Sequence, residues 1–93
     1  MSEGFERSTV HFSGHVQGVG FRWRTRALAE RFPITGYVRN LRDGRVKMVV
    51  EGAGSAVSSF LADLQAQMAA HVDERSVETS AATGEFGRFE IRR

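Results

Sequence analysis

The sequence predicts an α+β domain in which two helices pack on one face of an antiparallel sheet. Three observations carry this prediction. Short segments alternate apolar and polar residues with the period of two that strands require. Two longer segments repeat apolar residues every three or four positions, which is typical of amphipathic helices. These segments follow one another as strand, helix, hairpin, helix and strand, and 93 residues suffice for one such domain.

The first half of the chain contains a strand, a glycine-rich loop and a helix. Residues 8–13 alternate, with Val10 and Phe12 on one face, and are predicted to form a strand. After the loop, the stripe of a helix recurs at spacings of four, three and four residues: Phe21, Thr25, Leu28 and Phe32. Pro33 is expected to end this helix, because the residue before a proline avoids helical geometry.

The second half begins with a hairpin and continues into a second helix. Residues 36–41 and 45–51 are predicted strands, and Asp43-Gly44 between them supplies the positive φ angles of a tight turn. The helix is expected to start near Ser55, which would serve as its N-cap. Its apolar positions lie on one face: Val57, Phe60, Leu61, Leu64 and Met68.

Two further strands complete the predicted fold. A weak strand is expected around residues 76–79 and a final strand over residues 88–92. The order of elements is that of the ferredoxin-like split βαβ arrangement (βαββαβ). We expect this arrangement to occupy residues 1–93 as a single domain.

The composition excludes several classes of protein and of site. No apolar run approaches the roughly 20 residues of a membrane-spanning helix, and the N-terminus lacks a signal-peptide hydrophobic region. We therefore expect no membrane partner and a cytoplasmic location. Without cysteine there is no disulfide and no thiolate metal site. The three histidines are scattered, so we expect no metal site: His11, His15 and His71.

Charge is distributed unevenly along the chain, although the formal net charge is only +2. Residues 1–48 hold nine Lys/Arg against four Asp/Glu, a balance of +5, whereas residues 49–93 hold four against seven, a balance of −3. The positive half contains the glycine-rich loop. It either forms a solvated basic face or attracts an anionic substrate.

The glycine-rich loop is the main functional signal. Gly14, Gly18 and Gly20 lie within seven residues and can adopt the positive φ angles that turn backbone N–H groups inward. Arg22 follows at the start of the helix, where the helix dipole already carries roughly half a positive charge, and Arg26 adds repulsion one turn later. A cation is disfavoured there unless an anion lies beside it. The loop therefore predicts a cradle for a phosphate-sized dianion, the alternative being a turn without a ligand.

Three stricter motifs do not fit this loop. The dinucleotide fingerprint requires a third glycine where Trp23 stands, and the nucleotide P-loop requires a Gly-Lys-Ser/Thr triplet. Gly18-Val19-Gly20-Phe21 is similar to the aromatic-glycine motif of RNA-recognition domains, but in those domains the motif lies in a central strand. Because this segment lies in a loop, we expect no nucleic-acid partner.

Other polar and aromatic residues leave two interpretations open. Asn40 lies at the end of a predicted strand, on the same face as Val38 and hence toward the helices. It is either an ordinary asparagine before a turn, which spacing alone favours, or an amide that holds a water beside the bound phosphate. His15 is either an exposed loop residue or a phosphate ligand. We expect Trp23 at the rim of the site and Tyr37 in the core.

Two long segments of the chain resemble the signature motifs of the acylphosphatase family. The first is Gly14-x-Val16-Gln17-Gly18-Val19-Gly20-Phe21-Arg22 followed by Thr25, and the second is Gly36-Tyr37-Val38-x-Asn40 followed by Asp43-Gly44-x-Val46. The segment Phe89-Glu90-Ile91 resembles the family's terminal strand, so the similarity covers about the whole chain. The chain departs from the commonest pattern at positions that include His15, Tyr37 and Leu41, but not at Arg22 or Asn40.

The resemblance implies an enzyme that hydrolyses small acyl phosphates to a carboxylate and inorganic phosphate. It implies that Arg22 binds the phosphoryl group and that Asn40 orients the attacking water. The rest of the substrate-binding loop would be Gly14, His15, Val16, Gln17, Gly18, Val19, Gly20 and Phe21. It also implies a monomer that needs no metal or cofactor and has a small acyl phosphate as its partner.

Two alternatives to a free-standing enzyme are open at this point. One is a ferredoxin-like binding or regulatory module that senses anions or binds RNA. The other is a module that serves a larger maturation complex and hydrolyses acyl phosphates only incidentally. Asn40 favours the enzyme over a binding module, because phosphate binding needs only the loop and Arg22.

Overall fold

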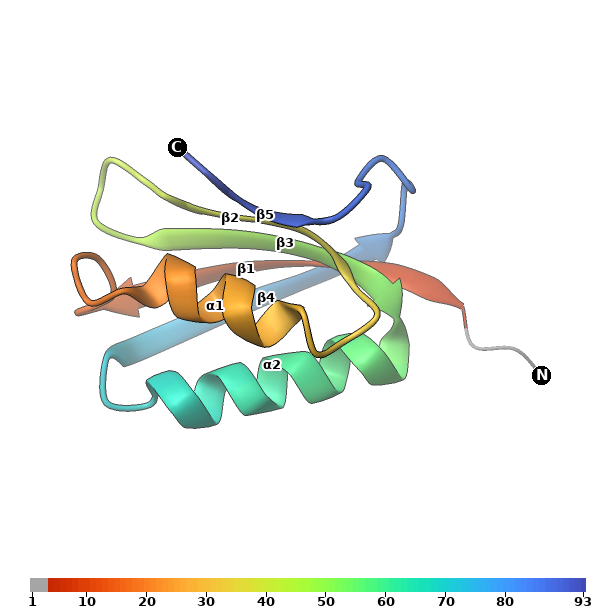
Figure 1. Cartoon of the computed structure of the whole chain (residues 1–93). Helices are drawn as coiled ribbons and strands as arrows, with labels where there is room; N and C mark the ends of the chain where they lie inside the picture. Colours follow the sequence, from red (N-terminus) through yellow and green to blue (C-terminus); the bar gives the residue numbers. More distant parts are fainter. Residues whose placement is uncertain (1–3) are drawn as a thin grey trace.

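The protein, described here by a computed structural model over residues 4–93, is a five-stranded sheet with both helices on one face (Figure 1). Its elements are β1 (Phe5–Gly14), α1 (Phe21–Ala29), β2 (Thr35–Asn40), β3 (Val46–Ala53), α2 (Gly54–Met68), β4 (Val72–Ala81) and β5 (Phe89–Arg92). The α+β ferredoxin-like fold is therefore confirmed. No helix in the described part of the chain is both long and apolar enough to cross a membrane.

The strands follow the spatial order β4-β1-β3-β2-β5, and one neighbouring pair departs from the expected antiparallel sheet. All pairs are antiparallel except β2 and β5, which run parallel. The reason is the connection between the two edges. The chain leaves β4 at one edge, crosses the end of the sheet through residues 82–88 and enters β5 at the other edge. This crossing turns β5 into the direction of β2.

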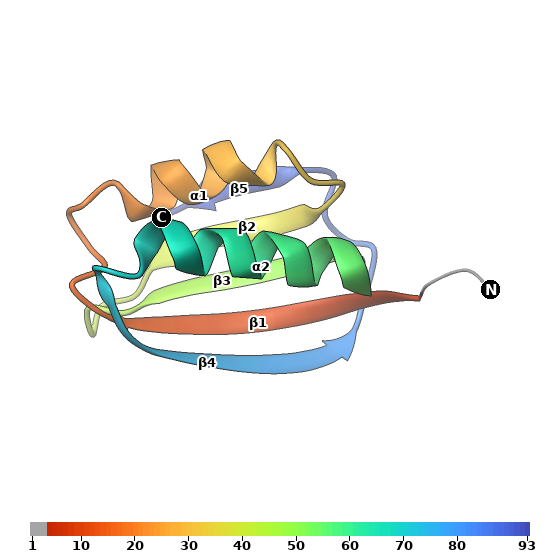
Figure 2. The same ribbon diagram turned by 90° about the horizontal axis from the view of Figure 1, so that it is seen from below.

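The core lies between the sheet and the helices, and it uses the residues that the sequence pattern predicts. Figure 2 shows α2 in front of the sheet and α1 on the side of β2 and β5. The strands contribute fully buried Val10, Phe12, Val38, Met48 and Val50, and the helices contribute Leu28, Val57, Phe60, Leu64 and Met68. Alternate strand residues lie on the opposite face of the sheet, which no helix covers and which we call the open face.

Both helix boundaries differ from the predicted ones. Helix α1 ends at Ala29, but the chain continues in tighter turns, because the Phe32 amide donates to the Ala29 carbonyl at 3.1 Å. Phe32 thus still contacts the core, with its ring 5.7 Å from that of Phe60. Helix α2 starts at Gly54 with Ala53 as its N-cap residue and no side-chain cap, so the assignment of Ser55 as the N-cap was wrong.

One loop, one strand and the side chain of Tyr37 also differ from the sequence-based expectation. The hairpin between β2 and β3 spans residues 41–45, and only Gly44 has a positive φ (95°), so it is not a tight two-residue turn. Asp43 instead accepts hydrogen bonds from the amide and the guanidinium of Arg45 at 3.1 and 2.9 Å. Strand β4 has ten residues rather than a weak core at 76–79, because it pairs along nearly all of β1. Tyr37 lies on the open face, where the Arg92 guanidinium is 4.4 Å from its ring centroid, and not in the core.

The crossing at residues 82–88 is held by a buried carboxylate on the open face. The side chain of Glu51 is only 3% exposed, and it accepts hydrogen bonds from Arg7 Nε (2.7 Å) and from the amides of Thr83 and Gly84 (both 3.0 Å). Burial by itself raises the pKa of Glu51, but these donors outweigh burial and lower the pKa to about 2. Glu51 therefore stabilises the fold as a charged group.

We expect Glu51→Gln to destabilise the protein by about 3 kcal/mol at neutral pH, since a shift of one pKa unit corresponds to about 1.4 kcal/mol. The folded-state pKa of about 2 lies below the ordinary value of 4.5, so this stability is present above pH 4.5 and is lost as the pH falls toward 2. Urea unfolding at a series of pH values measures it. The difference between wild type and variant should shrink steadily below pH 4.5.

Glu78→Gln is the matched control, because Glu78 is an exposed glutamate on β4. It should change the free energy of unfolding by less than about 0.5 kcal/mol. If Glu51→Gln behaved like this control, the buried carboxylate would not be what holds the crossing.

Candidate functional site

The loop between β1 and α1 adopts the conformation that its glycines predict. Gly14, Gly18 and Gly20 have positive φ angles of 125°, 79° and 77°. Gly14 is also required by a close approach: a Cβ atom there would lie 2.6 Å from the carbonyl oxygen of His71 and 2.7 Å from the amide of Asp73. A larger residue at this position would push the loop away from the connection between α2 and β4.

The loop presents backbone donors that nothing else in the described chain uses. The His15 amide donates to the His71 carbonyl at 2.9 Å and anchors the loop. The amides of residues 16–20 have no hydrogen-bond partner within residues 4–93. Unpaired amides beside a helix N-terminus form a ready site for an anion.

Helix α1 begins directly after this loop, and its first turn holds cations and no acidic residue. Its N-cap is Gly20, which provides no side-chain cap. Phe21 is buried against Phe12 (5.0 Å between ring centroids) and fixes the helix start on the sheet. Arg22 is half-buried, and no described residue forms an ion pair or hydrogen bond with its guanidinium. The positive helix end and the positive side chain are therefore uncompensated by the protein.

Asn40 completes the site from the sheet. It is the last residue of β2, on the same side as fully buried Val38, as the alternation predicted. Its Oδ1 atom is inaccessible to solvent and has no partner among the described residues. A buried acceptor without a partner costs about 1–3 kcal/mol, so such atoms require an explanation. Only a hydrogen-bond donor brought into contact with this atom would remove this cost.

These groups meet in a small pocket of about 180 Å³. It is lined by Val16, Gly18, Gly20, Phe21, Arg22, Trp23, Asn40 and Ile91. Of the predicted loop residues, four do not line it: Gly14, His15, Gln17 and Val19. The side chain of His15 is exposed. In the described part of the chain, no three His, Cys, Asp or Glu side chains lie close enough together to hold a metal ion.

Two residues at the site, Ile91 and Gln17, were not given their observed places by sequence reasoning. Ile91 reaches the pocket from β5, which only the parallel pairing with β2 brings beside Asn40. Trp23 lies at the pocket mouth, as expected for a rim residue, and is 65% exposed. Gln17 was assigned to the loop cradle, but its side chain faces the hairpin. Its Nε2 donates to the carbonyls of Leu41 at 2.8 Å and Arg45 at 3.0 Å.

Gln17 therefore ties the loop to the segment that follows Asn40. Arg22 and Asn40, which would contact a bound anion and its water, are 18 residues apart in sequence and belong to two elements, α1 and β2. The pair of hydrogen bonds from Gln17 fixes the distance between them through the backbone. No local sequence signal indicates such a tether, because it depends on the hairpin folding back over the loop.

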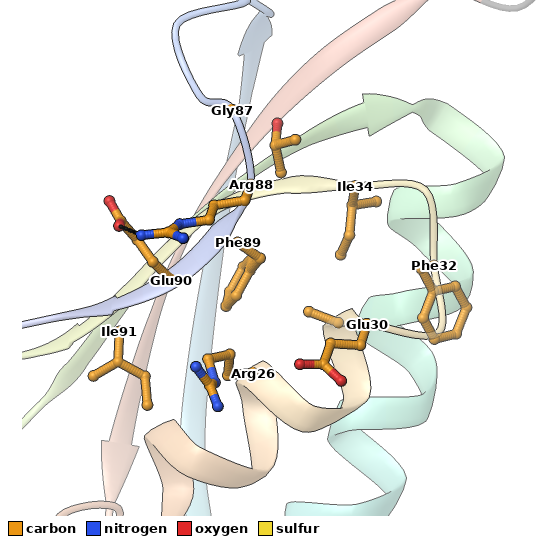
Figure 3. A pocket seen from close by; sticks show the side chains of 11 residues that line it. Arg26, Glu30, Phe32, Ile34, Gly87, Arg88, Phe89, Glu90 and Ile91 are labelled. Atoms are coloured by element: carbon orange, nitrogen blue, oxygen red, sulfur yellow. Dashed lines mark ion pairs between the residues drawn. The ribbon is translucent and has the colours of Figure 1, made fainter.

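A second and wider groove of about 580 Å³ lies between α1 and β5 (Figure 3). Its sides carry Arg26 of α1, Glu30 just after α1, and Arg88 and Glu90 from the β5 segment, so opposite charges balance. Phe89 and other apolar side chains form its base. It shares Ile91 with the small pocket, but neither the loop amides nor Arg22 line it. It is therefore not the anion cradle.

Comparison with known proteins yields one consistent family. Residues 8–91 match the family model described as Acylphosphatase. The chain is 39% identical over 85 residues to an acylphosphatase of Lactobacillus johnsonii, covering 89% of this chain and 93% of the relative. It is 44% identical over 87 residues to one of Thermobifida fusca, covering 92% and 96%. The crystal structure of acylphosphatase from Bacillus subtilis superposes with a TM-score of 0.84 at 30% identity, covering 95% of this chain and 99% of that one.

We expect Gln17→Ala to loosen the loop without unfolding the domain. The loss of two hydrogen bonds should cost about 1–2 kcal/mol of stability and speed hydrogen exchange at the amides of residues 16–20. Orthophosphate affinity, measured by NMR titration, should weaken several-fold because the donors are no longer held together. Gln65→Ala, a change at an exposed glutamine of α2, is the control and should alter neither quantity. Equal exchange rates in the two variants would contradict the tether.

Proposed function

The chain belongs to the acylphosphatase family and is an enzyme of that family, and we propose that it hydrolyses acyl phosphates by in-line attack of a water held by Asn40. The phosphoryl group would bind between the loop amides of residues 16–21 and Arg22. The products would be a carboxylate and inorganic phosphate. We further propose that residues 1–93 act as a single cytoplasmic domain and as a monomer.

One observation carries the proposal: the pocket joins an uncompensated cation with a side-chain amide. Arg22 and the loop amides supply positive charge and donors, which suit the phosphoryl oxygens. The side-chain amide of Asn40 lines the same pocket and can both donate and accept a hydrogen bond, which suits a water that must be held and aimed. A pocket that only binds anions would have no use for a group that also accepts.

The reaction needs little acid or base chemistry from the protein. In the proposed step, the water oxygen forms a bond to phosphorus while the bond from phosphorus to the acyl oxygen breaks. The electron pair of that bond leaves with the carboxylate, which is a stable anion, and a water proton passes to the phosphate. Phosphoryl transfer of this kind is accelerated chiefly by positioning and by charge stabilisation. Asn40 would position the water, and Arg22 would stabilise charge on the transferring group.

Removal of either side chain should abolish nearly all turnover while leaving the fold intact. We expect Arg22→Ala to lower kcat/KM about 10³-fold or more, as for arginines that contact a transferring phosphoryl group. Asn40→Ala should lower kcat about 10²-fold or more, in line with the loss of one positioning group. The two variants should differ in binding: Arg22→Ala should lose affinity for orthophosphate, whereas Asn40→Ala should keep it.

The control is Arg39→Ala, which removes an exposed arginine next to Asn40 in the sequence but on the open face. It should retain wild-type turnover. If Arg22→Ala or Asn40→Ala kept more than about a tenth of wild-type activity, the role proposed for that residue would be wrong, since tenfold is only about 1.4 kcal/mol.

The class of reaction is tested by phosphate release from benzoyl phosphate with excess chelator present. We expect fast release under chelation and no release from a simple phosphate monoester, whose leaving group is far more basic. Binding of orthophosphate without turnover would support the binding module instead. Release that required added Mg²⁺ would contradict the proposed absence of a metal from the reaction.

A further inference from the structure

We propose that the acyl group of the substrate lies across Trp23 and in the groove between α1 and α2. This acyl subsite would make the enzyme favour acyl phosphates with flat or apolar acyl groups over those with small ones. The proposal rests on the proposed function, because it concerns the part of the substrate that the phosphate pocket cannot hold.

Trp23 is an exposed aromatic residue that also lines the phosphate pocket. Three large apolar side chains in the described chain are markedly exposed: Phe5 at 71%, Trp23 at 65% and Val77 at 41%. Of these, only Trp23 lines the phosphate pocket. Its indole has no ring or guanidinium partner among the described residues. A large apolar surface at the mouth of a site indicates a surface that a ligand covers.

The direction of the reaction points the acyl group toward Trp23. Asn40 reaches the pocket from β2, on the sheet side, so a water held by its side chain would attack from that side, the base of the pocket. In-line displacement places the leaving group opposite the attacking water. The carboxylate must therefore leave toward the mouth, where the indole of Trp23 lies.

A groove of about 300 Å³ lies beside this mouth and has the right lining. Trp23 lines both the phosphate pocket and this groove, so the two are neighbours. Its other lining residues are Arg24, Ala27, Leu28, Arg31 and Gln67. The apolar members suit a hydrocarbon or an aromatic ring. The two exposed arginines and the absence of an acidic lining residue favour the negative charge that develops on the departing carboxylate.

The groove between α1 and β5 is a poorer candidate (Figure 3). It joins the phosphate pocket through Ile91, which pairs with Val38 in the sheet and so lies on the side of the attacking water. Its two arginines are balanced by Glu30 and Glu90, so it offers a departing carboxylate no net positive charge, unlike the groove beside Trp23. Charge and direction both disfavour it.

The test compares benzoyl phosphate with acetyl phosphate as substrates of the intact protein. We expect Trp23→Ala to lower kcat/KM for benzoyl phosphate about three- to tenfold, mainly through KM, and to change the value for acetyl phosphate less than twofold. Trp23→Phe should restore most of the lost preference. Phe5→Ala, which removes a comparably exposed ring at the far end of β1, should leave both values unchanged.

A direct readout uses the fact that Trp23 is the only tryptophan in the chain. Benzoyl phosphonate, which is not hydrolysed, should shift its emission to shorter wavelength by covering the indole, and orthophosphate alone should shift it less. An unshifted emission at saturating benzoyl phosphonate would overturn the proposal.

Two further outcomes would overturn it. The first is an unchanged ratio of the two kcat/KM values in Trp23→Ala. The second is a loss of the benzoyl preference in Arg26→Ala but not in Trp23→Ala, which would place the acyl group in the groove between α1 and β5. Failure of the proposed function gives a different result, because wild type would then hydrolyse neither substrate.

Discussion

Positive charge without a counter-charge at the start of α1 is the feature on which the site depends. The N-terminal end of a helix carries roughly half a positive charge, its first turn contains no acidic residue, and Arg22 adds a guanidinium that no described residue neutralises. Proteins normally avoid such an arrangement. Here the arrangement is maintained because Phe21 is buried against Phe12 and holds the helix end in place. In the function that we propose, the bound phosphoryl group would compensate this charge.

The fold holds this charged end on three sides. Strand β1 leads into the loop, the His71 carbonyl accepts a hydrogen bond from its beginning, and Gln17 joins its middle to the hairpin after β2. Each anchor uses a different part of the chain. The site is therefore a property of the assembled domain, although most of its residues are contiguous in sequence. The same assembly brings Asn40 from β2 to the pocket that the loop lines.

The open face stabilises the long crossing from β4 to β5. Glu51 is almost fully buried there and receives two amide hydrogen bonds from that crossing. Without the crossing, β5 could not pair with β2, and Ile91 would not reach the pocket. A structural carboxylate far from the anion cradle thus contributes to the shape of the site. This division leaves the helix-bearing face for binding and the open face for stability.

The sequence alone determined the class of the fold, the residues of the core and the uncompensated positive charge at the start of α1. Period-two and period-3.6 patterns depend on local geometry, so Val10, Phe12, Phe60 and Leu64 were found in the core as expected. The backbone angles of the loop were equally predictable, because Gly18 and Gly20 lack a Cβ atom and can adopt the positive φ angles that the turn requires. Spacing by itself could not decide whether Asn40 belonged to the turn or to the pocket. Only the tertiary structure placed Asn40 and Arg22 in one pocket, directed Gln17 to the hairpin and brought Ile91 to the pocket. The physical reason is that these contacts join segments far apart in the chain, and pairing across the sheet, not local preference, decides which of them meet.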